Sequence, residues 1–114
     1  MILSQKELKV ITDTAPTGEE RMRIFDLKSF PGISDNIGMF GHVSVNPGES
    51  VGYHVHTEEE ELYYILSGEA EYDDNGTKIP ISAGTLTYTP AGSGHGLTNT
   101  GKEPLCFIAL EIKR

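Results

Sequence analysis

The chain has 114 residues, of which 37% are hydrophobic and 23% are charged, and these proportions fit one globular domain. Nine basic residues stand against seventeen acidic ones, so the formal net charge is −8. Because binding to nucleic acid or to an anionic membrane requires basic patches, this charge argues against both classes of partner. The single cysteine, Cys106, excludes an internal disulfide framework, and we expect it to be a small, buried hydrophobic residue.

Neither a secretory signal nor a membrane span is predicted. Charged residues interrupt the first ten positions too early for the apolar core of a signal peptide. The longest apolar run, Leu105–Leu110, is far shorter than the roughly 20 residues that a membrane-spanning helix needs. We therefore expect a cytoplasmic protein.

The N-terminal end differs in pattern from the rest of the chain. Residues Gln5–Ile11 are compatible with a short helix, which Pro16 and Gly18 would end. We therefore divide the chain into an N-terminal arm, residues 1–20, and a barrel domain, residues 21–114. The arm is expected to contain that short helix or a strand that contacts a dimer partner.

From residue 21 onward, short strands alternate with turns rich in glycine and proline. The predicted strands are Arg21–Asp26, Met39–Val45, Gly52–His56, Glu61–Ser67, Glu69–Tyr72, Lys78–Ser82, Thr85–Thr89, His95–Asn99 and Leu105–Ile112. Asn75-Gly76 is the clearest hairpin turn, because both residues tolerate the positive φ of a type I′ loop. This spacing predicts an all-β sandwich or barrel. Such sheets often pair with a copy of themselves, so a homodimer is the expected assembly.

Three of the four histidines lie in two patterned blocks. Side chains at positions i and i+2 of a strand share a face, about 6.6 Å apart, so His54 and His56 point the same way. A tight reversal over residues 57–60 would then bring Glu61, at the start of the returning strand, beside them. His95 follows a Pro-Ala-Gly-Ser-Gly turn and opens another strand. Three imidazole nitrogens and one carboxylate oxygen suit Mn, Fe, Co, Ni or Zn.

The two blocks resemble the two motifs of the cupin family. The first motif is Gly, five residues, His-x-His, three or four residues, Glu, six residues and Gly. The second is Gly, five residues, Pro-x-Gly, two residues, His, three residues and Asn. The matching positions are Gly48, His54, His56, Glu61, Gly68, Gly84, Pro90, Gly92, His95 and Asn99. The resemblance covers residues 39–112 and implies a small, single-domain β-barrel of jelly-roll type with the ligands inside.

The acidic run 58–61 contains two candidates for the carboxylate ligand. Glu60 fits the three-residue spacer of the first motif and Glu61 fits the four-residue spacer. The step to Gly68 and the alternation of the strand both select Glu61. We expect Glu58 and Glu59 to lie in a solvated turn. The predicted ligands of one divalent metal are therefore His54, His56, Glu61 and His95.

Other residues carry weaker expectations. His42, Tyr53 and Tyr63 are candidates for a catalytic acid or base, although His42 lies outside both motifs and its simpler interpretation is a surface or lumen histidine. Asn99 is expected to make hydrogen bonds at a strand end. Several residues are candidates for lining the pocket, but ordinary barrel packing is the simpler interpretation of each; they are Met39, Phe40, Tyr53, Tyr63, Ile65 and Leu97.

The predicted ligand set points to a chemical rather than a structural metal site. Four protein ligands leave up to two positions of an octahedral metal open. A divalent cation beside one carboxylate favours an anion, so a bidentate carboxylate, an enolate or a 2-oxo acid is the expected ligand. The resemblance implies a metal-dependent enzyme of the dioxygenase, decarboxylase or isomerase type. The alternative is a non-catalytic module that binds or senses a small carboxylate or a sugar acid.

Overall fold

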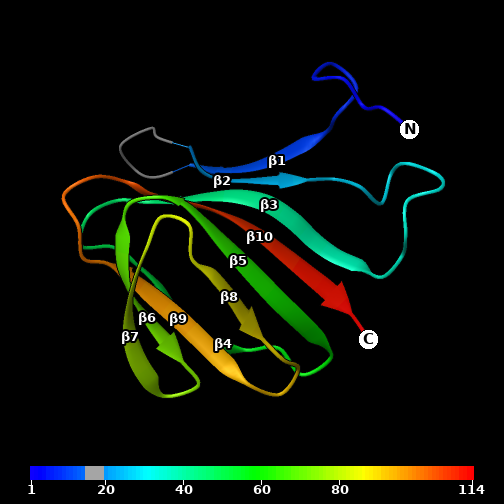
Figure 1. Ribbon diagram of the computed structural model, residues 1–114. Coiled ribbons are helices and arrows are strands. Elements are labelled where there is room, and N and C mark those ends of the chain that lie inside the picture. Colours follow the sequence, from blue (N-terminus) through cyan, green and yellow to red (C-terminus); the bar gives the residue numbers. More distant parts are fainter. Residues whose placement is uncertain (15–19) are drawn as a thin grey trace.

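The computed structural model describes residues 1–14 and 20–114, which form two antiparallel β-sheets that face each other (Figure 1). The larger sheet has the strand order β1-β2-β3-β10-β5-β8, and the smaller sheet has the order β4-β9-β6-β7. The strands are β1 (Val10–Thr14), β2 (Glu20–Phe25), β3 (Ile37–Val45), β4 (Ser50–Val55), β5 (Glu59–Ser67), β6 (Glu69–Asp74), β7 (Thr77–Ser82), β8 (Leu86–Thr89), β9 (Gly94–Asn99) and β10 (Leu105–Lys113).

The nine predicted strands correspond to β2–β10, and each of their bounds lies within two residues of the prediction. The turn at Asn75-Gly76 is confirmed, since both residues have positive φ, at 49° and 99°. None of the described residues forms a helix with the length and hydropathy that crossing a membrane would require.

Of the two structures expected in the N-terminal arm, a short helix or a strand, the described residues form the strand. Over residues 5–11 the chain makes a turn at Gln5–Glu7, closed by the backbone of Ser4, and then enters β1 at Val10. β1 pairs with β2, and this sheet pairing outweighs the local helical tendency. The predicted stop at Pro16 and Gly18 lies outside the described residues. The division of the chain after residue 20 stays a prediction.

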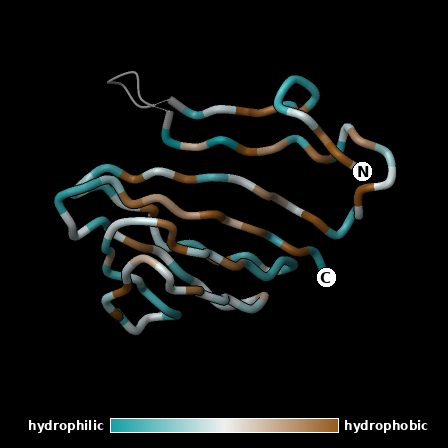
Figure 2. The backbone as a smooth tube through the Cα atoms, turned by 45° about the horizontal axis from the view of Figure 1, so that its top comes forward, coloured by the Kyte–Doolittle hydropathy of each residue, from teal (hydrophilic) through white to brown (hydrophobic). Residues whose placement is uncertain are grey.

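One hydrophobic core fills the space between the two sheets. Its buried members are Val43, Val45, Tyr63, Ile65, Ala70, Tyr72, Leu97, Leu105, Phe107 and Ala109. Strand alternation explains this set on β5, where Tyr63 and Ile65 are buried while Tyr64 and Leu66 are each 46% exposed. Figure 2 shows that hydrophobic residues recur along the strands of both sheets. The buried face of β5 is therefore the one that the alternation of its residues predicts.

Two predicted details concern residues at or near the strand ends. Asn99 is buried, and its Nδ2 donates to the carbonyls of Val45 and Glu103, at 2.9 and 2.8 Å, which confirms the expected hydrogen-bonding role. Cys106 is half-buried rather than buried. It lies between the buried residues Leu105 and Phe107 on β10 and therefore faces away from the core.

Gly68 connects β5 of the larger sheet to β6 of the smaller one. Its φ is +93°, and an added Cβ would lie 2.9 Å from Cα of Leu105. Only glycine combines this backbone conformation with so close an approach. The chain can therefore cross from one sheet to the other at this point.

Candidate metal centre

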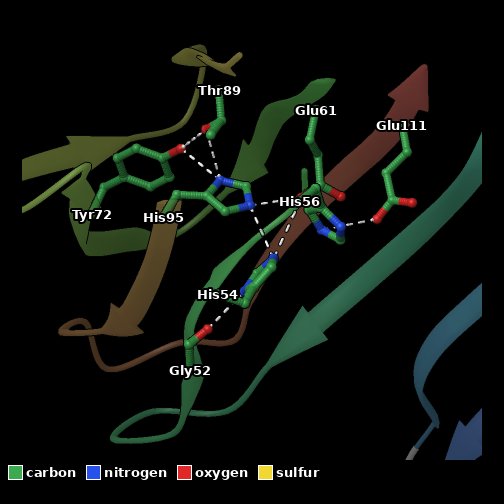
Figure 3. Close-up of polar contacts among 8 residues, drawn as sticks. All are labelled: Gly52, His54, His56, Glu61, Tyr72, Thr89, His95 and Glu111. Atoms are coloured by element: carbon green, nitrogen blue, oxygen red, sulfur yellow. Dashed lines mark hydrogen bonds and ion pairs between the residues drawn. The ribbon is translucent and has the colours of Figure 1, made fainter. Parts of the chain in front are cut away.

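The four predicted ligands converge between the two sheets (Figure 3). Their ligand atoms all lie within 4.8 Å of one another. Nε2 of His95 is 2.6 Å from Oε1 of Glu61 and 3.1 Å from Nε2 of His54. Nε2 of His54 and Nε2 of His56 are each 3.6 Å from the same carboxylate oxygen. Adjacent ligands of a metal with bonds of about 2.1 Å lie roughly 3 Å apart, so these spacings suit one ion.

Both sheets contribute to the cluster. In the smaller sheet, His54 on β4 is the cross-strand partner of His95 on β9, and His56 follows the last residue of β4. In the larger sheet, Glu61 on β5 is the cross-strand partner of Glu111 on β10. The register of the strands therefore positions three imidazoles from one side and a carboxylate from the other.

Strand alternation separates the four acidic residues of the run. Glu61 is 3% exposed and faces the histidines. Glu60 faces the opposite way, where its Oε2 lies 3.1 Å from the hydroxyl of Tyr88 and 3.2 Å from Nε of Arg114. Glu58 is exposed, as predicted. The solvated turn predicted for Glu59 is wrong, because β5 begins at this residue and alternation places Glu59 on the same face as Glu61.

Neighbouring oxygens orient two of the histidines. Nδ1 of His95 lies 2.8 Å from the Tyr72 hydroxyl and 3.0 Å from the Thr89 hydroxyl. Nδ1 of His54 lies 2.8 Å from the carbonyl oxygen of Gly52. A histidine that binds a metal through Nε2 carries its proton on Nδ1 and donates it to such an oxygen. These contacts therefore leave both Nε2 atoms free to face a cation.

A metal ion fits the donor set. Nε2 of His56 is buried and makes no hydrogen bond with any residue that the structure describes. A buried nitrogen without a hydrogen bond is costly, and a cation at the centre of the cluster would accept its lone pair. Imidazole and carboxylate together are typical ligands of divalent transition metals. His54, His56, Glu61 and His95 therefore form a candidate site for such an ion.

Comparison with known proteins identifies the family of this fold. Residues 41–111 match the cupin domain family. The chain belongs to the cupin family. This cupin is 38% identical over 95 residues to the oxalate-binding protein of Thermotoga maritima, covering 83% of the chain and 78% of that protein.

Solved structures agree with the family. The crystal structure of a predicted oxalate decarboxylase from Thermotoga maritima is similar to this cupin over the full length of both chains, with 32% identity and a TM-score of 0.76. A protein from Klebsiella pneumoniae with a double-stranded β-helix domain has 24% identity and a TM-score of 0.68, covering 92% of this cupin and 77% of that chain. The fold is therefore the double-stranded β-helix of cupins, which confirms the predicted jelly-roll barrel.

The pKa values of two carboxyl groups at the site, those of Glu61 and Glu111, are shifted in opposite directions. Burial raises the pKa of Glu61, but contacts with His95, Glu111 and His56 outweigh burial and hold that pKa below its usual value. Burial and the adjacent carboxylates of Glu59 and Glu61 raise the pKa of Glu111 to about 8. Glu61 is thus ionised at neutral pH, which is the state that a metal ligand requires.

The structure separates the three candidates for an acid or base. Tyr63 lies beside the cluster, where its ring stacks on His95 with centroids 4.7 Å apart. Burial, and then the charge of Glu61, raise the pKa of Tyr63. His42 is the cross-strand partner of Ile108 and lies on the outer face of the larger sheet. Tyr53 is 52% exposed, and its ring covers Gly94 on the outer face of the smaller sheet.

Sequence reasoning missed three residues around the site. Tyr72 and Thr89 hold His95, and Glu111 lies 3.3 Å from His56. The inward positions of β10 alternate through Phe107 and Ala109, so the same alternation identifies Glu111 as a charged side chain that faces the interior. No comparable signal marks Tyr72 or Thr89. The contact of Tyr72 depends on the pairing of β6 with β9, and that of Thr89 depends on how the two sheets pack.

Proposed function

We propose that this cupin binds a small dicarboxylate, with oxalate as the first candidate, through a divalent transition metal. The observation that carries this proposal is the convergence of His54, His56, Glu61 and His95 between the sheets. The Thermotoga maritima matches, an oxalate-binding protein and the structure of a predicted oxalate decarboxylase, support oxalate as the ligand class. Four protein ligands leave two positions on an octahedral ion, and the two oxygens of a dicarboxylate can fill both.

The charge of the proposed metal site favours an anionic ligand at short distance, whereas the net charge of the whole chain does not. Three neutral imidazoles and one carboxylate leave a divalent cation with a net charge of about +1 in a site of low dielectric constant. The net charge of −8 repels an approaching anion at long range. We therefore expect direct coordination to supply the affinity, with little contribution from electrostatic steering.

The reaction that we propose to test first is decarboxylation, with dioxygenase and isomerase chemistry as alternatives. A bound metal would polarise a carboxylate oxygen of the substrate. Of the three candidate acids and bases, Tyr63 is the one beside the ligand cluster. Its raised pKa keeps the hydroxyl protonated at neutral pH and makes it a weak acid, so it is suited to donate a hydrogen bond to a bound anion rather than to transfer a proton.

The second candidate function is binding without turnover, which the name of the 38% identical oxalate-binding protein favours. One experiment separates the two. Protein reconstituted anaerobically with Mn²⁺, Fe²⁺, Co²⁺, Ni²⁺ or Zn²⁺ is titrated with oxalate by calorimetry and then incubated with ¹³C-oxalate, while NMR records formate and an electrode records oxygen uptake. Metal-dependent product indicates an enzyme, whereas metal-dependent binding without product indicates a binding module. Absence of oxalate binding with every metal would reject both.

We further propose that this cupin is a homodimer, and a cytoplasmic location also stays a prediction. The outer face of the larger sheet carries two cross-strand pairs of large apolar residues, Tyr64 with Leu86 and Leu62 with Tyr88. Tyr64, Leu86 and Tyr88 are each at least 46% exposed. An antiparallel sheet with one solvated face is normally polar on that face, so these residues support coverage by a second copy.

A further inference from the structure

Glu111 lies next to the predicted ligands but belongs to none of the family motifs. It is the cross-strand partner of Glu61 on β5 and of Met39 on β3, so its backbone is held beside the site by two strands. Its side chain is only 14% exposed, and its Oε1 lies 3.3 Å from Nε2 of His56. Figure 3 shows Glu111 approaching His56 from the side opposite His95.

The approach of Glu111 to His56 is close without being a hydrogen bond. Nε2 of His56 makes no hydrogen bond with any described residue, although the carboxylate oxygen is within 3.3 Å. The two atoms are therefore at ion-pair distance without the geometry of a hydrogen bond. The same nitrogen lies 3.6 Å from Oε1 of Glu61, and adjacent ligands of one metal lie roughly 3 Å apart.

Glu59 lies close to Glu111 and to His56. His56, Glu59 and Glu111 form a second group whose ligand atoms lie within 4.8 Å of one another. Oε2 of Glu59 is buried without a hydrogen-bond partner among the described residues, and a side chain at Gly38 would collide with this carboxylate. The carboxylate of Glu111 is thus confined between the position of Glu59 and that of the metal ligands.

We propose that Glu111 is an additional ligand of the metal bound by His54, His56, Glu61 and His95. Glu111 shares a group with His56 and Glu59 rather than with all four residues, so its side chain has to rotate for the carboxylate to reach the ion. Glu111 then occupies one of the two positions that the other ligands leave open. A bidentate anion has to displace it, so Glu111 strengthens metal binding and weakens anion binding. This inference rests on the proposed metal site.

The number of water molecules on bound Mn²⁺ tests this inference without measuring activity. Water-proton relaxation of the Mn²⁺-loaded protein counts rapidly exchanging waters on the ion. If five side chains bind an octahedral ion, one water remains in the wild type, and Glu111→Ala leaves two. We also expect Glu111→Ala to lower Mn²⁺ affinity about tenfold, and to raise the affinity of the loaded protein for oxalate about tenfold.

Glu60→Ala is the matched control, because it removes a carboxylate from β5 that contacts Tyr88 and Arg114 on the outer face. We expect it to leave the water count and the Mn²⁺ affinity unchanged. Glu111→Gln preserves the size of the side chain and gives the same comparison if the alanine variant unfolds. Equal water counts in the wild type and both Glu111 variants, with Mn²⁺ still bound, overturn this inference alone. A wild type that binds none of Mn²⁺, Fe²⁺, Co²⁺, Ni²⁺ and Zn²⁺ overturns the proposed function as well.

Discussion

The phenolic oxygen of Tyr72 lies 2.8 Å from Nδ1 of His95, deep between the two sheets. The Thr89 hydroxyl lies 3.0 Å from the same nitrogen and 3.0 Å from the Tyr72 oxygen, so the three groups form a closed polar triangle. The Nδ1–H of His95 donates to one of the two hydroxyl oxygens at a time. The other hydroxyl forms a hydrogen bond with the hydroxyl that accepts this proton. Nε2 of His95 is thereby turned toward Glu61 and the candidate metal site.

Removing this triangle should weaken metal binding. We expect Tyr72→Phe or Thr89→Val alone to lower Co²⁺ affinity only a few-fold, because the other hydroxyl remains, and the double variant to lower it about 10- to 100-fold. Competition with a chromophoric chelator measures the affinity. Tyr64→Phe removes a hydroxyl from the outer face of the same barrel and serves as the control. An unchanged affinity in the double variant would show that the triangle does not position His95.

The ligand assignment predicts a contrast between His95 and Glu58. His95→Ala removes a ligand and leaves Oε1 of Glu61 without its 2.6 Å partner, so we expect a severe loss of bound metal. Glu58 is exposed and lies outside the cluster, and Glu58→Ala should bind metal like the wild type. Elemental analysis of the purified proteins measures both. Equal metal content in the two variants would contradict the assignment.

The stability of the metal-free protein should depend on Glu111. Its pKa is raised to about 8 in the folded chain, from an ordinary value of 4.5. Between these values the folded protein holds a proton that the unfolded chain has released, so the free energy of unfolding decreases as pH rises from 4.5 to about 8. The stabilisation is complete below pH 4.5.

Urea unfolding in the presence of EDTA, across the window from pH 4.5 to about 8, measures this dependence. Glu111→Gln has no proton to release and should show a flatter decline over the same window. Identical slopes for the wild type and the variant would assign the dependence to other groups. Glu61, whose pKa is lowered, acts in the opposite direction and loses its stabilisation as pH falls below its ordinary value of 4.5.

Two glycines with similar backbone conformations should tolerate alanine differently. Gly68 and Gly84 have φ of +93° and +89°, but an added Cβ meets the backbone of Leu105 at Gly68 and nothing within 4 Å at Gly84. We expect Gly84→Ala to cost about 1 kcal/mol from strain alone, and Gly68→Ala about 3 kcal/mol because a clash is added. Chemical denaturation measures both. Equal costs would mean that the neighbouring backbone moves away freely.

The apolar outer face of the larger sheet predicts the oligomeric state. We expect the wild type to be a dimer in light scattering coupled to size-exclusion chromatography, and the double variant Tyr64→Lys, Leu86→Lys to be a monomer, because two charges per copy would be buried. Val55→Lys changes a residue that is 48% exposed on the smaller sheet and should remain dimeric. A monomeric wild type would reject the proposed dimer.

Local pattern was enough to predict most of the fold. Glycines and prolines bound the strands, and the alternation of Tyr63 and Ile65 with Tyr64 identifies the inner face of β5. For the N-terminal arm the pattern leaves a short helix or a strand open. The structure has the strand, because Val10–Thr14 is stabilised by its pairing with β2 rather than by its own composition. β5 also begins two residues earlier than predicted, at Glu59. A run of four glutamates is typical of a solvated turn, so the sequence gives no sign that the strand has already begun.

The spacing of the motifs predicts four ligands, which the structure brings together, but it carries no information on the residues around them. Tyr72 meets His95 because β6 pairs with β9 in the smaller sheet, and Thr89 on β8 meets His95 only after the larger sheet packs against the smaller one. His42 and Tyr53 were candidates by residue type, but strand alternation directs both to the outer surface. Residue type thus predicts which chemical groups are available. The pairing of the strands and the packing of the sheets decide which of these groups lie at the site.

His54 and His95 belong to the smaller sheet, and Glu61 belongs to the larger one. A cation held by all three is a cross-link between the two layers, in a chain whose single cysteine cannot form one. Losing the ion would release the layers at that end of the barrel and expose the core to proteases. The lifetime of this protein would then follow the supply of free metal around it.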